Sequence, residues 1–146
     1  MLPGDGETEP RTMRNLFGSI GAGDILMTYT VNKEVRNWKR RLISSTYTFL
    51  INFLFNLKLK YFNGPSLIRV ELLKKLPPIS PGFAYMSEIL VRLIKSGYSY
   101  KELEMYIKPS PDRKSRAFRL KNIKQVGETV LKLFIDIYFK RKILYV

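Results

Sequence analysis

The chain has 146 residues, of which 45% are hydrophobic and 13% aromatic. This length suits one ordinary domain and supplies enough apolar material for a core, so a wholly disordered chain is excluded. Because the sequence holds no histidine and no cysteine, zinc sites built on these residues are excluded, and so are serine–histidine and cysteine–histidine catalysis. Any catalysis would depend on carboxylates, hydroxyls, Lys or Arg side chains, the backbone or an oxygen-bound metal.

The formal net charge of +14 is unevenly distributed. Up to Asn32 the chain carries two basic and four acidic residues, whereas the remainder carries 24 basic and 8 acidic residues. A basic field of this strength concentrates anionic partners such as nucleic acid, anionic lipid or phosphorylated substrates.

The N-terminal part of the chain predicts a loop, a short helix and a buried strand. Residues 1–9 are acidic and rich in turn residues, without the basic and apolar regions of a signal peptide. A loop of this kind at the first residue leads us to expect a fragment of a longer protein. Apolar residues at helical spacing predict a helix over 10–20, and the apolar, β-branched run 24–31 predicts a buried strand.

Residues 37–58 predict a helix that is unusually rich in apolar side chains and has Lys39, Arg40 and Arg41 near its start. Its longest uncharged stretch, residues 42–57, has 16 residues, whereas a membrane-spanning helix needs about 20 mostly apolar ones. We therefore expect no transmembrane span. Two alternatives remain open, namely a helix in the protein core and a helix lying in a membrane interface.

Turn residues 63–65 precede a predicted strand over 66–70 and a short helix over 71–76. Residues 83–96 predict the clearest amphipathic helix, with Arg92 and Lys95 off its apolar side and Gly97 as its C-terminal stop.

The C-terminal part predicts a strand over 98–108, a basic loop over 112–116 and a long helix over 117–142. Between residues 108 and 142 there are 11 basic and 3 acidic residues. The last helix is therefore expected to be both amphipathic and basic.

Five motifs punctuate these elements in a fixed order. They are the acidic loop with Asp5 and Pro10, Arg-Leu-Ile-Ser over 41–44 preceded by Arg40, Asn-Gly-Pro-Ser over 63–66, the helix with Glu88 that leads to Gly97, and Lys114-Ser115-Arg116. Together they resemble the C-terminal half of the family 2 glycosyltransferases, especially the dolichyl-phosphate mannosyltransferase-like branch. The resemblance covers nearly the whole chain.

The resemblance implies an α/β fold: the C-terminal part of a GT-A type (nucleotide-diphospho-sugar transferase) fold with two long amphipathic helices. Residues 1–116 would form a partial GT-A glycosyltransferase domain whose nucleotide-binding first half is missing. Residues 117–146 would form a C-terminal basic amphipathic helix.

The activity implied by the resemblance is transfer of a sugar from a nucleoside diphosphate sugar to a lipid-linked or other acceptor, with inversion. Asp5 matches the second Asp of the family's D-x-D loop, while Pro3 replaces the first. Asp5 would thus be a catalytic residue that binds a divalent metal, Mg²⁺ or Mn²⁺, which acts as a Lewis acid on the leaving diphosphate. Glu88 would be a catalytic carboxylate of the acceptor site. Its alternatives are a surface charge and an ion-pair partner for Arg92, four residues further on.

The acceptor phosphate would be bound, by resemblance, by Arg40, Ser44, Lys114, Ser115 and Arg116. Arg40 and Ser44 are four residues apart and so share one helix face. A hydroxyl acceptor would need a carboxylate to take its proton, whereas a polyprenyl phosphate is already an oxyanion.

The family has an Asp and an Arg at about the positions of Tyr61 and Tyr29. Both departures leave room for another acceptor.

The two long basic helices, 37–58 and 117–142, would place the protein peripherally at the cytosolic face of a membrane, where Lys140, Arg141 and Lys142 attract anionic headgroups. The alternative is that their apolar faces pack against the missing half or another subunit. Two other functions remain open. A nucleic-acid-binding module is less favoured because the sequence has no recognised nucleic-acid motif, and the other is an inactive structural remnant.

Overall fold

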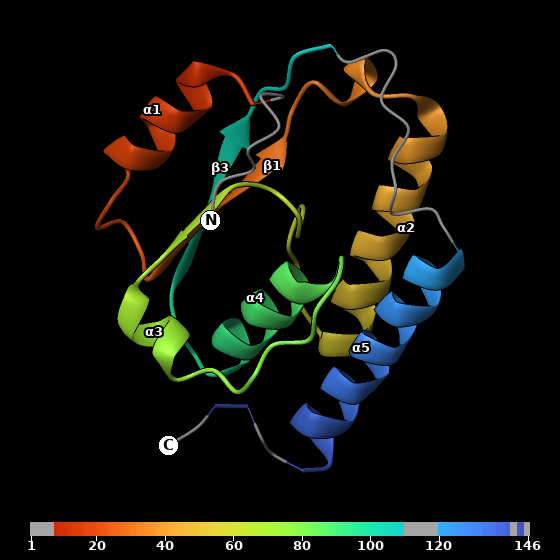
Figure 1. Ribbon diagram of the computed structural model, residues 1–146. Helices are drawn as coiled ribbons and strands as arrows, with labels where there is room; N and C mark the ends of the chain where they lie inside the picture. Colours follow the sequence, from red (N-terminus) through yellow and green to blue (C-terminus); the bar gives the residue numbers. More distant parts are fainter. Residues whose placement is uncertain (1–7, 110–119, 141–142, 145–146) are drawn as a thin grey trace. The chain divides into compact units, whose positions relative to one another are not determined.

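The computed structural model describes residues 8–109, 120–140 and 143–144. In this part the chain is a mixed α/β protein with one three-stranded sheet and five α-helices (Figure 1). In chain order the elements are α1 (Pro10–Gly18), β1 (Ile25–Thr30), the 3-10 turn η1 (Lys33–Val35), α2 (Trp38–Phe55), β2 (Ser66–Ile68), α3 (Val70–Lys74), α4 (Tyr85–Lys95), β3 (Tyr100–Met105) and α5 (Leu120–Tyr138). The predicted α/β class is confirmed, and the finer GT-A assignment stays a prediction.

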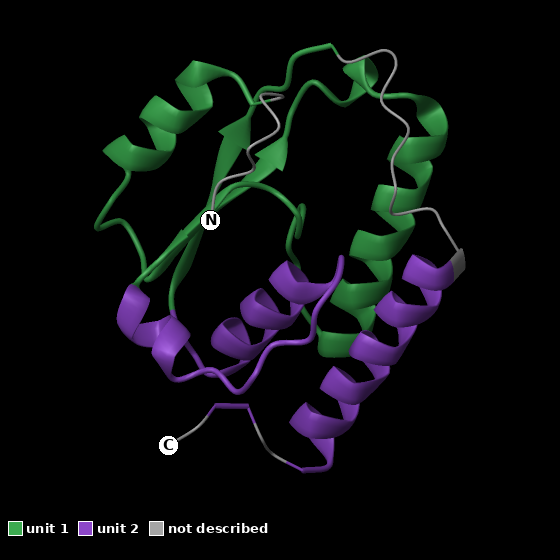
Figure 2. Cartoon of the chain, viewed as in Figure 1, with its two compact units in different colours: residues 1–69, 99–113 green, residues 70–98, 114–146 purple. Residues whose placement is uncertain are grey.

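The chain divides into two compact units, each built from two separate segments (Figure 2). Unit 1 comprises residues 1–69 and 99–113, and unit 2 comprises residues 70–98 and 114–146. The domain boundary expected at residue 116 falls among residues that lie outside the described ranges.

The sheet of unit 1 has the strand order β2-β1-β3. Strand β1 pairs antiparallel with β2, where Leu26 lies opposite Leu67, and parallel with β3, where Thr28 lies opposite Leu103. Five of its six residues are buried, so the prediction of a buried strand is confirmed. The helix α1 lies beside β3, where the Tyr106 N–H donates to Thr12 Oγ1 at 3.0 Å.

The segment that enters β2 passes very close to β1 at Gly64. A Cβ atom at this position would overlap the backbone oxygen and the side chain of Thr28, so only glycine fits there. The Thr28 hydroxyl also donates to the Pro65 carbonyl oxygen at 3.0 Å. Gly64 and Pro65 therefore lie directly against the central strand.

The helix α2 has a defined beginning and end. At its start, the Asn37 side chain accepts a hydrogen bond from the Lys39 N–H at 2.9 Å. At its end, Asn56 adopts a left-handed conformation with φ 48°. The Asn52 side chain then exchanges two hydrogen bonds with the Leu59 backbone, at 2.7 and 3.0 Å. This folds the chain back along the helix, so Lys60 lies beside α2.

Unit 2 pairs α4 with α5. The helix α4 ends as predicted, because Gly97 follows it with a φ of +86°. Arg92, expected off the apolar side of α4, is buried, and its side chain is only 1% exposed. Two carboxylates, from Glu88 and Asp136, accompany its guanidinium into the interior and compensate its charge.

One prediction concerns Asp24, which lies just before β1. The Ser99 hydroxyl at 2.6 Å and the Ser99 N–H at 3.0 Å, followed by Arg69, lower the pKa of Asp24 below its ordinary value of 3.8. Because the pKa is lowered in the folded state, this carboxylate stabilises the fold above that value, and the contribution is lost as the pH falls through the lowered pKa. We expect the free energy of unfolding to fall less steeply with decreasing pH in Asp24→Asn than in the unchanged chain.

Urea unfolding measured at a series of pH values below pH 5 checks this expectation. Glu34→Gln removes an exposed carboxylate of the same unit and serves as the control. If the free energy of unfolding of Asp24→Asn falls with decreasing pH as steeply as that of Glu34→Gln, the role given to Asp24 is wrong.

Candidate anion-binding site

Unit 1 contains a cavity of about 320 Å³ between η1, α2 and the segment after α2. It is lined by Thr30, Lys33, Arg36, Arg40, Arg41, Ser44, Ser45, Thr48, Phe49, Asn52, Lys60 and Tyr61. Five of these twelve residues are Lys or Arg, and none of the twelve is acidic. A concave site lined by one sign of charge focuses the electric field and favours anions.

Hydroxyl groups complete the lining of this cavity. Four of the lining residues are serines or threonines, whose hydroxyls donate one hydrogen bond each. Cations and hydroxyls in combination suit an anion that carries several acceptor oxygens, because hydrogen bonds between charged groups are short and strong. A phosphate group has this chemistry.

The sequence-predicted pair Arg40 and Ser44 lines this cavity together. The prediction that both residues share one face of the helix is therefore confirmed. The other residues assigned by resemblance to the phosphate, Lys114, Ser115 and Arg116, lie outside the described residues, and so does Asp5.

Two further cations of the cavity, Arg36 and Lys60, are held by tyrosines. Arg36 Nη1 donates to Tyr61 Oη at 3.3 Å, and Lys60 Nζ lies 4.0 Å from the centre of the Tyr29 ring. The Lys60 N–H also donates to Glu102 Oε1 at 2.7 Å. Each of the two cations therefore has a tyrosine partner inside unit 1.

Sequence reasoning missed Arg36 and Lys60. Each contacts a tyrosine at least 25 residues away, and no local spacing rule reports such a pairing. A signal was available at Tyr61 and Tyr29, which stand where the family has an Asp and an Arg. In the structure these tyrosines are the partners of the two cations.

A buried hydroxyl of the lining, that of Thr30, has no hydrogen-bond partner among the described residues. The Thr30 side chain is 3% exposed, and its Oγ1 makes no hydrogen bond within the part of the chain that the structure describes. A buried hydroxyl in this state costs free energy. Because Thr30 lines the cavity, a ligand oxygen there would satisfy it.

An exposed apolar stripe runs along α2 next to the cavity. Its members are 58–73% exposed and are Trp38, Leu42, Phe49 and Phe53. At 100° per residue these positions fall within a wedge of about 60° on the helix. Phe49 stacks on Phe53 with ring centres 6.2 Å apart and also lines the cavity. The stripe, here called the α2 stripe, is thus continuous with the cationic site, and exposed apolar patches mark interaction surfaces.

None of the described helices combines the length and the apolar character that crossing a bilayer requires.

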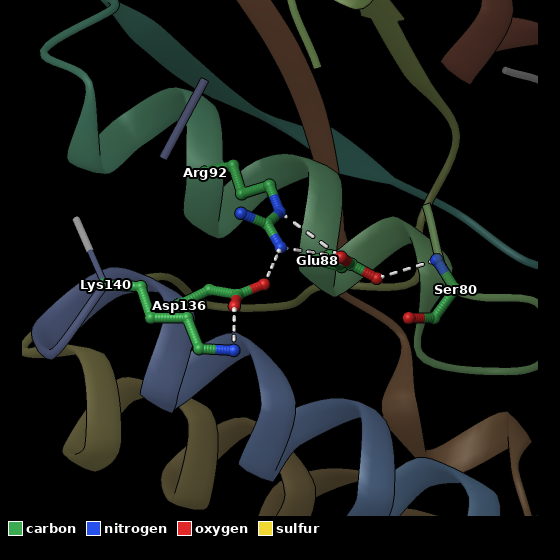
Figure 3. A network of polar contacts seen from close by, with 5 residues as sticks. All are labelled: Ser80, Glu88, Arg92, Asp136 and Lys140. Atoms are coloured by element: carbon green, nitrogen blue, oxygen red, sulfur yellow. Dashed lines mark hydrogen bonds and ion pairs between the residues drawn. The ribbon is translucent and has the colours of Figure 1, made fainter. Parts of the chain in front are cut away.

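Glu88 lies in unit 2 and is fully engaged in polar contacts (Figure 3). Its Oε1 accepts from Arg92 Nε at 3.2 Å and from Nη2 at 3.0 Å, while its Oε2 accepts from the Ser80 N–H at 3.0 Å. The alternative of an ion pair with Arg92 is confirmed, and the alternative of a surface charge is wrong because Glu88 is 1% exposed. Glu88 does not line the cationic cavity, and its catalytic role stays a prediction.

Among the described residues there is no cluster of three or more carboxylates that could hold a metal ion. Comparisons of the chain with models of protein families, with curated proteins and with solved structures found no match.

Proposed function

We propose that the chain is the C-terminal part of a family 2 type glycosyltransferase with a GT-A fold. It transfers a sugar from a nucleoside diphosphate sugar to a lipid-linked phosphate, at the cytosolic surface of a membrane. One observation carries this proposal: Arg40 and Ser44, which the resemblance assigns to the acceptor phosphate, line one cationic cavity.

The composition of the cavity favours a phosphate acceptor over a hydroxyl acceptor. A hydroxyl must lose its proton to a base as it attacks, but the cavity lining holds neither a carboxylate nor a histidine. A phosphate monoester arrives already ionised and needs only to be oriented. Five cations compensate its negative charge in a way that would gain nothing for a neutral alcohol.

In the proposed reaction, Arg40 and Ser44 hold the phosphate so that one of its oxygens faces the anomeric carbon of the donor sugar. That oxygen forms the new bond while the bond from the anomeric carbon to the diphosphate breaks on the opposite side. The leaving diphosphate takes the bonding electron pair, and the configuration inverts. A divalent metal at Asp5 would neutralise charge that develops on the diphosphate.

The α2 stripe supports a lipid-linked acceptor rather than a water-soluble phosphate. An apolar chain attached to a phosphate in the cavity can leave over Phe49 onto the stripe, because Phe49 belongs to both. Covering such a surface removes exposed aromatic area from water. An aromatic stripe flanked by basic residues is also typical of helices that lie in a membrane interface.

Binding of farnesyl phosphate and of farnesol tests the proposal. Trp38 is the only tryptophan of the chain and belongs to the α2 stripe, so its fluorescence reports the arrival of an apolar chain. We expect farnesyl phosphate to bind at least about tenfold more tightly than farnesol, since each charge-assisted hydrogen bond contributes about 1.5–3 kcal/mol. Its affinity should fall as salt is added.

Inorganic phosphate serves as the matched control without an apolar chain. It should bind more weakly than farnesyl phosphate and leave Trp38 fluorescence unchanged. Equal affinity for farnesol and farnesyl phosphate would contradict the anionic acceptor. Transfer of labelled sugar to the prenyl phosphate, tested with a panel of nucleoside diphosphate sugars on the longer protein of which this chain would be the C-terminal part, then identifies the donor.

A further inference from the structure

Unit 2 holds a second cavity, of about 410 Å³, that the proposed sugar transfer does not use. Its polar wall consists of Arg92, Lys132, Asp136 and Lys140, and its apolar wall of two prolines, at 77 and 78, and Leu144. Arg92 belongs to α4, Lys132 and Asp136 belong to α5, and Lys140 lies two residues after the end of α5. The cavity therefore belongs to the paired helices of this unit.

A charge network lies in the polar wall (Figure 3). Arg92 Nη2 donates to Glu88 Oε1 at 3.0 Å and to Asp136 Oδ2 at 2.9 Å, and Lys140 Nζ lies 3.8 Å from Asp136 Oδ1. These two cations and two carboxylates balance one another. Lys132 is an additional cation, which gives the cavity a positive excess.

The network also makes the cavity rigid. Arg92 and Glu88 are each 1% exposed, and a buried ion pair with several hydrogen bonds fixes the side chains that take part. Lys140 is half exposed, and Lys132 is exposed. The two lysines thus lie where the cavity meets solvent, next to the buried ion pairs of the network.

Exposed apolar residues adjoin these lysines in the sequence of α5 and directly after its end, and they are here called the apolar patch. Its residues are Leu131, Tyr138 and Phe139. Leu131 directly precedes Lys132, and Phe139 directly precedes Lys140. Cations next to exposed aromatic and aliphatic side chains match the two layers of a membrane interface, the phosphates and the upper acyl chains.

We propose that this second cavity binds the phosphate of an anionic phospholipid headgroup. Lys132 and Lys140 donate hydrogen bonds to the phosphate oxygens, while Leu131 and Phe139 contact the acyl chains. The apolar patch favours a lipid over a free phosphate, which would leave that patch exposed. The inference deepens the membrane part of the proposed function and rests on it, but it concerns a site separate from the acceptor cavity of unit 1.

Vesicle binding of the full chain tests this site. Vesicles of phosphatidylcholine mixed with phosphatidylglycerol are compared with vesicles of phosphatidylcholine alone, in a sedimentation assay. The double variant Lys132→Gln/Lys140→Gln should bind the anionic vesicles about 30-fold more weakly, because each lysine at an anionic surface contributes about a factor of five. Lys132→Gln alone should cost about fivefold, and it leaves the network around Asp136 untouched.

The matched control is Lys121→Gln/Lys124→Gln, which removes the same charge from exposed positions of the same helix. We expect the control to lose less than about threefold. Equal losses in both double variants would show general attraction by the basic field and would overturn the site.

Two other outcomes separate the site from the wider proposal. If the wild-type chain ignores anionic vesicles, both the site and the membrane part of the proposed function fail, whereas farnesyl phosphate binding at the first cavity is unaffected. If inorganic phosphate alone binds tightly without vesicles, and the Lys132 and Lys140 variants abolish that binding, the lipid assignment is overturned.

Discussion

Replacing Arg92 by methionine is expected to lower the free energy of unfolding by about 3–5 kcal/mol. Methionine fills much of the same volume, so the loss does not come from a cavity. It comes from two carboxylates, Glu88 and Asp136, that keep their burial and lose the guanidinium that compensates them. Urea denaturation at pH 7, followed by circular dichroism, measures the effect.

Lys95→Met is the matched control, because it also replaces a cationic side chain by methionine, three residues further along α4 at a half-buried position. It should cost less than about 1 kcal/mol. Adding Glu88→Gln and Asp136→Asn to Arg92→Met should recover part of the lost stability, since the uncompensated charges are then gone. An Arg92→Met variant as stable as the control would mean that the network contributes little.

The Arg92 network also shows where local sequence patterns stop being informative. The spacing of four residues offered an ion pair of Glu88 with Arg92 as one of three alternatives for Glu88, and this pair exists. The second carboxylate comes from Asp136, 44 residues away in the sequence. From the sequence, Arg92 was expected only to lie off the apolar side of α4. The burial of an ionised side chain depends on partners that only the tertiary fold supplies.

The elements themselves could be predicted because their signals are local. Apolar periodicity located α2, α4 and the strand β1, while turn residues and Gly97 marked their ends. The sequence could not predict which side of α2 faces solvent. Its apolar residues occur on most of its circumference, so the sequence left the core and the membrane interface open, whereas the structure exposes Trp38 and Phe53 and buries Ile51 and Phe55.

Part of the lining of the first cavity could be predicted from the sequence. Arg40 and Ser44 share a helix face by simple geometry, and the structure places them in one lining. Lys60 joins them only because Asn52 turns the chain back after α2 and Gly64 lets it approach β1. Contacts between residues so far apart in the chain produce no periodic pattern in the sequence.

Arg40→Ala is expected to weaken binding of farnesyl phosphate by about 10- to 150-fold, the effect of losing one hydrogen bond between charged groups. Ser44→Ala should cost less, about tenfold or below, because its hydroxyl is neutral. Neither variant should alter the affinity for farnesol, which has no phosphate. Trp38 fluorescence measures all four combinations in the same assay.

Lys39→Ala is the control that distinguishes binding at a defined site from general electrostatic attraction by the basic chain. Lys39 directly precedes Arg40, carries the same charge and is exposed, but it does not line the cavity. General attraction by the basic chain would make Lys39→Ala and Arg40→Ala equivalent, since both remove one positive charge from the first turn of α2. A bound phosphate distinguishes them, because a directed hydrogen bond acts only at contact whereas the field of one exposed charge is screened within about 10 Å at moderate salt. Repeating the titration at higher salt should therefore reduce the effect of Lys39→Ala to nothing and leave that of Arg40→Ala in place.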